Sequence, residues 1–288
     1  MAPLVVIVGE TASGKSALAM EVAKKYNGEI ICADSRTIFK GMNIGTAKPS
    51  MQDQLEVPHH LLNVVNPDEQ FTVVDFKKQA EAAIEQICAR GHLPIIVGGT
   101  GLYVDAVLFN YQFAPKPSPE LRGALKQLTV DELKAQLDSQ GVTYPEAEKN
   151  KRHLIRILER GGMPENNRTN IRDNTLVVGL SIPRAELRQR IYDRVQQMMD
   201  QGILDEVRTI GEQYGWSSEA MTANIYRIFA EVIRGRKRVG DAMAEAAQAD
   251  IYLAKRQRTW FKRNLFIQWQ TSGSEARHVI EQFLASRI

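Results

Sequence analysis

Residues 4–16 read Leu-Val-Val-Ile-Val-Gly-Glu-Thr-Ala-Ser-Gly-Lys-Ser, and this stretch decides the fold class. The apolar, mostly β-branched run Leu4–Val8 predicts a buried strand. The next eight residues, Gly9–Ser16, match G-x-x-x-x-G-K-[ST], and helical spacing follows from Gly14 to Tyr26. This motif folds its backbone N–H groups around phosphate oxygens when it lies between a strand and a helix. The stretch therefore predicts an α/β protein with a phosphate-binding loop (P-loop) after its first strand.

The rest of the chain predicts a parallel sheet covered by helices. Further strands are expected at Glu29–Ala33, Leu93–Val97, Thr175–Ile182 and Leu265–Trp269. Between Glu29–Ala33 and Leu93–Val97, a capping pattern at Thr72 begins an amphipathic helix. Strands that alternate with helices in this way are typical of parallel sheets.

A proline-rich segment at 114–119 interrupts this alternation and predicts a domain boundary. Beyond it, one helix is expected to be capped by Thr129, and another to run from about Glu146 to Arg160. We therefore expect a helical insertion domain at 115–172. The P-loop core domain would consist of 1–114 and 173–288, with basic helices in its C-terminal part.

Composition narrows the class of protein. The chain has 288 residues, of which 43% are hydrophobic and 25% charged, the usual mixture for a globular protein. Its two cysteines, Cys32 and Cys88, lack the C-x-x-C spacing of zinc or redox sites and are expected to be reduced. The longest uncharged stretch, Leu93–Val104, is too short for a bilayer span of about 20 residues. We expect a cytoplasmic protein with no membrane contact.

Positive charge is concentrated in two blocks, although the net charge is only +3. Residues 227–263 carry ten Lys or Arg against four acids, and residues 149–172 carry seven against two. Such blocks favour a polyanionic partner such as nucleic acid. The alternative, solvated faces of surface helices, stays open on charge alone.

The P-loop supplies candidate phosphate ligands. Lys15 would place its charge on the terminal phosphate, and the Ser16 hydroxyl would ligate Mg²⁺, the expected cofactor. Asp34 ends the second predicted strand, where it would face the phosphates as a general base or through metal-bound water. The expected diphosphate- or nucleotide-binding residues are Gly9, Glu10, Thr11, Ala12, Ser13, Gly14, Lys15 and Ser16.

Several further segments, taken with the P-loop, resemble the tRNA dimethylallyltransferase (tRNA isopentenyltransferase) family, bacterial type. The runs Lys40–Pro49 and Gly98–Tyr103 are far more specific than the P-loop itself. The other matching segments are Gly9–Ser16, Ala33–Arg36, Val57–Leu61, Asp75–Phe76, Arg152–Glu159, Arg190–Ile191, Gly202, Glu206–Arg208 and Ala254–Phe261.

The resemblance implies transfer of a dimethylallyl group from dimethylallyl diphosphate to N6 of the adenosine at position 37, beside the tRNA anticodon. The P-loop would then hold the allylic diphosphate, and Lys15 would stabilise the leaving group. The family pattern implies Asp34 as the base for the adenine amine and Arg190 as a catalytic arginine, with Arg194 as a second candidate. The implied partners are dimethylallyl diphosphate and the tRNA anticodon stem-loop, and no obligate protein partner is evident.

The resemblance also implies where tRNA is bound. The implied contacts are Asp34, Ser35, Arg36, Thr37, Thr100, Arg152, His153, Leu154, Ile155 and Arg156. The basic segment Lys255–Lys262 is expected to contribute to RNA binding, while its aromatics Trp260 and Phe261 either stack on bases or belong to the core. The pair His59-His60 is expected to form structural hydrogen bonds.

Four positions depart from the family pattern. The family usually has Pro at Glu10, Gln or Leu at Thr37, Asp at Asn43 and Gly at Ile225. Glu10 is the least expected, because it brings a negative charge beside a loop that should bind diphosphate.

Three other functions remain open on the sequence. A relative could prenylate free AMP, ADP or ATP, although a mononucleotide needs neither the basic helices nor the helical insertion. A P-loop kinase for small molecules would transfer phosphate from ATP. A tRNA-binding protein without catalysis is disfavoured by the presence of Lys15, Asp34 and Arg190.

Overall fold

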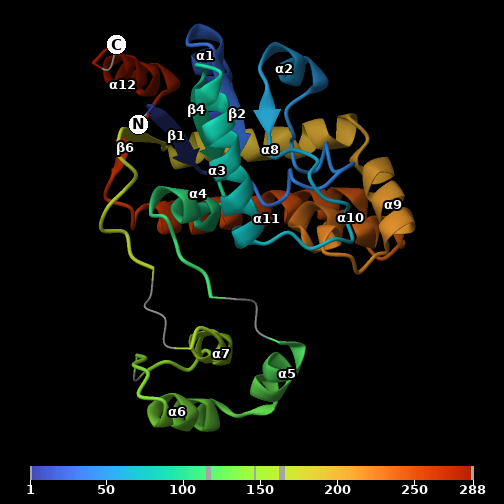
Figure 1. Ribbon diagram of the computed structural model, residues 1–288. Coiled ribbons are helices and arrows are strands. Elements are labelled where there is room, and N and C mark those ends of the chain that lie inside the picture. The colour runs from blue at the N-terminus through green and yellow to red at the C-terminus, as the bar shows by residue number, and fades with distance from the viewer. Residues whose placement is uncertain (1, 115–117, 146, 162–165, 287–288) are drawn as a thin grey trace. The chain divides into compact units, whose positions relative to one another are not determined.

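A six-stranded parallel sheet forms the centre of the larger of two structural units (Figure 1). The structure, a computed structural model, describes residues 2–114, 118–145, 147–161 and 166–286. The strand order is β3-β2-β4-β1-β5-β6, so the P-loop follows a strand with neighbours on both sides. The strands are β1 (Leu4–Gly9), β2 (Gly28–Cys32), β3 (His59–His60), β4 (Leu93–Gly98), β5 (Thr175–Leu180) and β6 (Ile267–Gln270).

The predicted α/β class is confirmed, and most strands lie where apolar runs predicted them. Strands β1 and β4 are buried throughout, as expected when helices cover both faces of a parallel sheet. Strand β3 has no apolar run and was not predicted. It forms because Ile30 and Ile31 pair with His59 and His60.

Helices cover both faces of this sheet. Helices α1 (Lys15–Lys25) and α12 (Gly273–Ala285) share one core with Ile7 and Ile95. On the other face, α3 (Val73–Ala89) and α4 (Gly101–Leu108) share a core with Val6, Ile31 and Ile96. The capping box of Thr72 and Asp75 that begins α3 is present as predicted.

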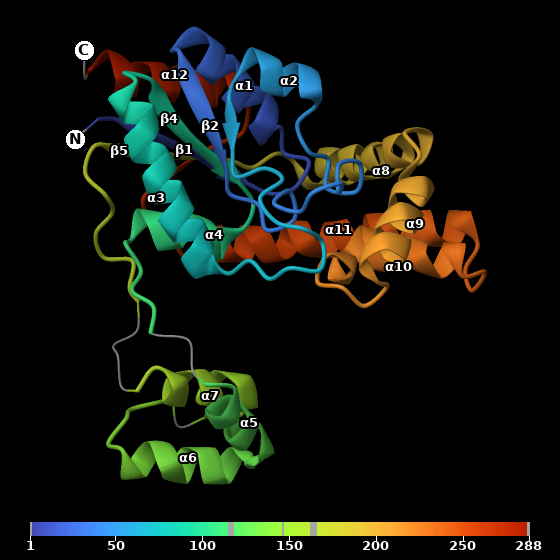
Figure 2. The same ribbon diagram turned by 45° about the vertical axis from the view of Figure 1, so that its right-hand side comes forward.

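A further group of helices packs around the segment that follows β2 (Figure 2). Helix α11 belongs to this core through Ala254, and to the core under the sheet through Phe261. One long helix thus connects the two cores and passes the end of the P-loop strand. The elements of this group are α8 (Arg184–Asp200), α9 (Ile203–Tyr214), η1 (Ala220–Thr222), α10 (Asn224–Ile233) and α11 (Val239–Phe261), and α2 (Met51–Glu56) lies outside their core.

The smaller unit, Tyr111–Asn167, is helical in its described residues. It contains α5 (Pro119–Gln127), α6 (Val130–Ser139) and α7 (Lys151–Glu159) around its own leucine-rich core. The predicted start of the last helix near Glu146 was wrong. Asn150 caps α7 by accepting from the backbone N–H of Arg152 at 3.1 Å, and Glu146 itself lies outside the described residues.

The boundaries between the units fall slightly earlier than the sequence suggested. The division lies after Asn110 and before Arg168, whereas 115–172 was expected. The return segment belongs to the larger unit because Arg168 binds Asp105 of α4, and the N–H of Arg172 donates to the carbonyl of Leu108. Sequence composition marked the proline-rich exit but could not show these contacts.

Both cysteines are free, and Cys32 is buried, with its thiol pKa raised to about 12 by desolvation. No helix in the described part of the chain is long and apolar enough to span a membrane.

Candidate active site

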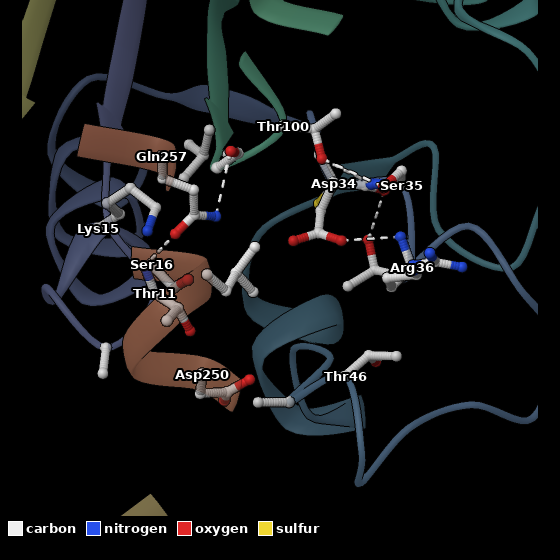
Figure 3. A pocket seen from close by; sticks show the side chains of 18 of the residues that line it. Thr11, Lys15, Ser16, Asp34, Ser35, Arg36, Thr46, Thr100, Asp250 and Gln257 are labelled. Carbon is white, nitrogen blue, oxygen red and sulfur yellow. Dashed lines mark hydrogen bonds between the residues drawn. The ribbon is translucent and has the colours of Figure 1, made fainter. Parts of the chain in front are cut away.

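A cavity of about 630 Å³ lies beside the P-loop in the larger unit (Figure 3). Lys15 and Ser16 line it from the start of α1, Asp34 from the end of β2, and Thr100 from the end of β4. Helices α8 and α11 close other sides. Because the carboxyl ends of neighbouring parallel strands meet at one edge, residues far apart in sequence converge here.

The P-loop has the backbone shape that phosphate binding requires. Gly14 has φ 96°, a left-handed conformation that favours glycine, and helix α1 begins at the next residue. Lys15 donates from Nζ to the carbonyl oxygen of Glu10 at 2.5 Å, so its ammonium is held inside the loop. Burial lowers the pKa of Lys15 to about 8, although the nearby carboxylate of Asp34 opposes this shift. The loop thus presents a partly desolvated cation beside the N-terminus of a helix.

Glu10 does not oppose an anion in the loop. Its side chain is buried and forms an ion pair with Arg258 of α11, with Nη2 donating to Oε2 at 3.0 Å. The same guanidinium also donates to Ser181 Oγ at 3.2 Å. The negative charge that looked misplaced in the sequence is therefore neutralised within the protein. Arg258 lies in the segment Lys255–Lys262 that is expected to bind RNA, but its guanidinium is paired with Glu10 within the protein.

Asp34 and Thr100 are held together by backbone contacts at adjacent strand ends. Asp34 Oδ1 accepts from the N–H of Arg36 at 2.8 Å, which orients the carboxylate into the cavity (Figure 3). Thr100 Oγ1 accepts from the N–H of Ser35 at 3.0 Å and makes no side-chain cap to α4. The Thr37 hydroxyl donates to the carbonyl of Asp34 at 3.4 Å. The side chains of Asp34, the predicted base, and Thr100, the predicted contact to the acceptor, are therefore both fixed by backbone N–H groups of the segment Ser35–Arg36.

The two candidate arginines line different hollows, both of which include Gly14 of the P-loop. Arg194 Nη1 donates to Thr11 Oγ1 at 2.6 Å, and Arg194 lines the main cavity with Lys15. Arg190, one turn earlier on α8, is paired with Glu186 at 2.6 Å and lines a separate hollow of about 400 Å³. Arg194 thus lines the same cavity as Lys15, whereas Arg190 Nη1 would lie 3.6 Å from a Cβ atom added at Gly14, the residue before Lys15.

Two polar residues of α11 line the cavity and were not singled out from the sequence. Asp250 is 4% exposed, and burial raises its pKa. Gln257 accepts from the N–H of Thr11 at 2.8 Å and donates to the carbonyl of Gly99 at 3.1 Å. Their seven-residue spacing places them on one helix face. That spacing was the only signal in the sequence, and it does not show that the face meets the P-loop.

The predicted RNA-contacting segment of the smaller unit is divided between core and surface. Leu154 and Ile155 are buried in the core of that unit, whereas Arg152 and Arg156 are exposed. His153 lies 2.5 Å from Glu148 through Nδ1. Only the exposed arginines present charge to an outside partner.

Trp260 and Phe261 of α11 pack against the core under the sheet, whereas Tyr252 of the same helix is exposed. Phe261 is fully buried, and Trp260 donates from Nε1 to Asp105 Oδ2 at 2.7 Å.

The pair His59-His60 forms structural hydrogen bonds, as expected. His60 Nε2 lies 2.6 Å from Glu29, and His59 Nδ1 lies 2.7 Å from the carbonyl of Val57.

Comparison with known proteins shows the family of this chain. The family model described as IPP transferase matches residues 37–264. The tRNA dimethylallyltransferase of Macrococcus caseolyticus is 36% identical over 99% of this chain and 96% of its own length. The crystal structure of the full-length tRNA isopentenylpyrophosphate transferase of Bacillus halodurans has a TM-score of 0.77 and 31% identity, covering 99% of this chain and 96% of that one. The tRNA delta(2)-isopentenylpyrophosphate transferase of Staphylococcus epidermidis has a TM-score of 0.76 and 33% identity over both whole chains. This chain therefore belongs to the IPP transferase family.

Proposed function

We propose that this enzyme transfers the dimethylallyl group of dimethylallyl diphosphate to N6 of adenosine 37 in tRNA. The observation that carries the proposal is one cavity lined by both a P-loop lysine, Lys15 after β1, and a carboxylate, Asp34 after β2, at the ends of the two strands that flank β4. A phosphate-bearing donor and an amine-bearing acceptor would meet between these two groups. The relatives named tRNA dimethylallyltransferase support this reading over a kinase.

The P-loop would stabilise the departing diphosphate. As the carbon–oxygen bond of the donor breaks, negative charge grows on the diphosphate, and groups that already face it lower the barrier. Lys15 and Arg194 supply the positive charge, and the backbone N–H groups of the loop add hydrogen bonds. Arg190 would reach the diphosphate only from the second hollow, which also includes Gly14.

Magnesium fits this site only as a partner of the substrate. In the described part of the chain, no group of three or more acidic, histidine or cysteine side chains converges to hold a metal. The exposed Ser16 hydroxyl is one hard oxygen ligand, and a bound diphosphate would provide the others. Mg²⁺ held in this way would neutralise charge on the leaving diphosphate.

Asp34 would accept the proton from the acceptor. The N6 amine of adenine is a weak nucleophile because its lone pair is delocalised into the ring. As N6 bonds to C1 of the dimethylallyl group, the amine loses one proton to Asp34 and the diphosphate leaves with the bonding pair. Thr100 holds the backbone beside Asp34 and lines the same wall of the cavity.

The choice of tRNA over a free nucleotide rests on exposed positive charge. Lys255 and Arg256 are exposed on α11, and Arg256 also lines the cavity. Arg152 and Arg156 are exposed on α7 of the smaller unit. A polynucleotide can use such charges through its backbone phosphates, whereas a mononucleotide fills only the cavity. With tRNA as substrate, we place the reaction in the cytoplasm.

The test is incubation with labelled dimethylallyl diphosphate and either tRNA, AMP or ATP. Label should appear on tRNA and not on either nucleotide. Prenylated AMP or ATP, or transfer of a phosphoryl group from ATP, would contradict the proposal.

A variant tests the role of the base. Asp34→Asn should lower the rate of transfer by about 10²–10⁴-fold, because proton transfer to a positioned group contributes about that much. Affinity for tRNA should stay within about twofold. The exposed Asp68→Asn is the matched control and should keep wild-type turnover. An equal loss of tRNA affinity and turnover in Asp34→Asn would show that Asp34 is structural.

A further inference from the structure

We propose that Gln257 is a positioning residue that sets the separation between the P-loop and the loop that carries Thr100. The inference rests on the proposed function, in which one loop binds the donor and the other faces the acceptor. Its basis is a side-chain amide that bonds to both loops at once. Gln257 Oε1 accepts from the N–H of Thr11 at 2.8 Å, and Nε2 donates to the carbonyl of Gly99 at 3.1 Å (Figure 3).

The contact with the loop that carries Thr100 leaves no room for a residue larger than glycine at position 99. A Cβ atom added at Gly99 would lie 2.2 Å from Gln257 Nε2 and 3.6 Å from the carbonyl oxygen of Gly9. Gly99 therefore lets the amide approach the backbone directly. The next residue along the chain is Thr100. A shift of the Gly99 carbonyl would therefore move Thr100, which faces the acceptor in the proposed function.

The contact with the P-loop is made at the Glu10–Thr11 peptide group, which is hydrogen-bonded through both its C=O and its N–H. The carbonyl of Glu10 accepts from Lys15, and the N–H of Thr11 in the same peptide unit donates to Gln257. Arg194 holds the Thr11 hydroxyl. When a diphosphate draws Lys15 toward itself, Gln257 still ties this peptide to Gly99.

The chemistry explains why this spacing matters. Transfer requires C1 of the donor and N6 of the acceptor to lie about 3–3.5 Å apart and in line. The donor would be bound through Lys15, and the acceptor would lie beside Asp34 and Thr100. A displacement of about 1 Å between the two loops can reduce the rate about 100-fold without removing any group that binds a substrate.

Glutamine has the functional groups that this position needs, and close analogues do not. The amide accepts from one backbone group and donates to the other. A carboxylate in Gln257→Glu would keep the bond to Thr11 but face the carbonyl of Gly99 with a second acceptor. Gln257→Leu has similar shape and makes neither bond.

Single-turnover transfer to tRNA, with enzyme in excess, tests the proposal. For Gln257→Glu and Gln257→Leu, the rate should fall about 10- to 100-fold. The Kd of inorganic diphosphate and the Kd of the tRNA should each stay within about twofold. Gln213→Glu, the same change at an exposed position of α9, should transfer at the wild-type rate.

The outcomes separate this proposal from the proposed function. A wild-type transfer rate in folded Gln257→Leu would overturn the positioning role, as would a loss that is wholly explained by weaker diphosphate binding. Absence of any product with the wild-type enzyme would instead overturn the proposed function. Thermal unfolding of each variant identifies a folding defect, and Gln257→Leu, which adds no buried charge, keeps the test valid if Gln257→Glu does not fold.

Discussion

Removing Arg258 should destabilise the protein strongly, because it would leave the carboxylate of Glu10 buried without its charge partner. The side chains of Glu10 and Arg258 are only 3% and 20% exposed. Breaking a buried pair by removing one partner costs about 3–5 kcal/mol. The free energy of unfolding of Arg258→Met should fall by that amount. At about 2–4 °C per kcal/mol, the Tm should fall by roughly 6–20 °C.

Removing both charges should cost less than removing Arg258 alone. In Glu10→Gln with Arg258→Met, a neutral amide replaces the carboxylate, and no unpaired charge remains in the interior. Arg258→Met alone should therefore be less stable than the double variant. Arg188→Met, at an exposed arginine of α8, is the control and should change stability by less than about 0.5 kcal/mol.

Equilibrium unfolding in urea measures these differences, and thermal unfolding provides an independent check. The four proteins of the cycle are the wild type, the two single variants and the double variant. If the effects of the single variants add within about 0.5 kcal/mol, Glu10 and Arg258 do not interact and the reasoning is refuted.

Three further predictions concern binding and turnover. Burial holds the pKa of Lys15 at about 8, so its positive charge is lost as pH rises through that value. Affinity for dimethylallyl diphosphate should therefore fall between about pH 7 and pH 9 in the wild type but not in Lys15→Arg, as measured by calorimetry without tRNA. Equal pH dependence of the affinity in both proteins would contradict a role for the Lys15 charge. At saturating substrate, Arg194→Met should lower kcat by about 10²–10³-fold and Arg190→Met by less than about tenfold. The reason is that, of the two, only Arg194 lines the cavity with Lys15. The reverse order would make Arg190 the principal arginine. Arg256→Ala should weaken tRNA binding and reduce the slope of log Kd against log salt by about one phosphate contact, and an unchanged slope in a salt titration would remove Arg256 from the RNA-binding surface.

The sequence predicted the elements whose signal is local. Strand β1, the P-loop and helix α1 follow directly from residues 4–25, because burial and phosphate-loop geometry each have a short-range pattern. The capping boxes at Thr72 and Thr129 likewise appear where the spacing predicted them. Strand β3 was missed because its two residues become a strand only by pairing with β2.

The candidate site was predicted in part. Lys15, Ser16, Asp34 and Thr100 lie on one cavity, as expected from the carboxyl ends of parallel strands. Which of the two arginines lines the cavity was not predictable, because Arg190 and Arg194 share a helical face within one turn. The position of α8 relative to the P-loop, which periodicity does not give, decides which of them lines the cavity.

By itself, the sequence determined the class of fold and the backbone geometry of the first loop. These properties depend on neighbouring residues, whose backbone geometry a short motif specifies. Only the tertiary structure decided what becomes of Glu10 and which residues connect the two loops of the site. Arg258 and Gln257 reach the P-loop from about 250 positions away in the chain. The packing of α11 against the strand ends creates those contacts, and it depends on the whole core rather than on any local pattern.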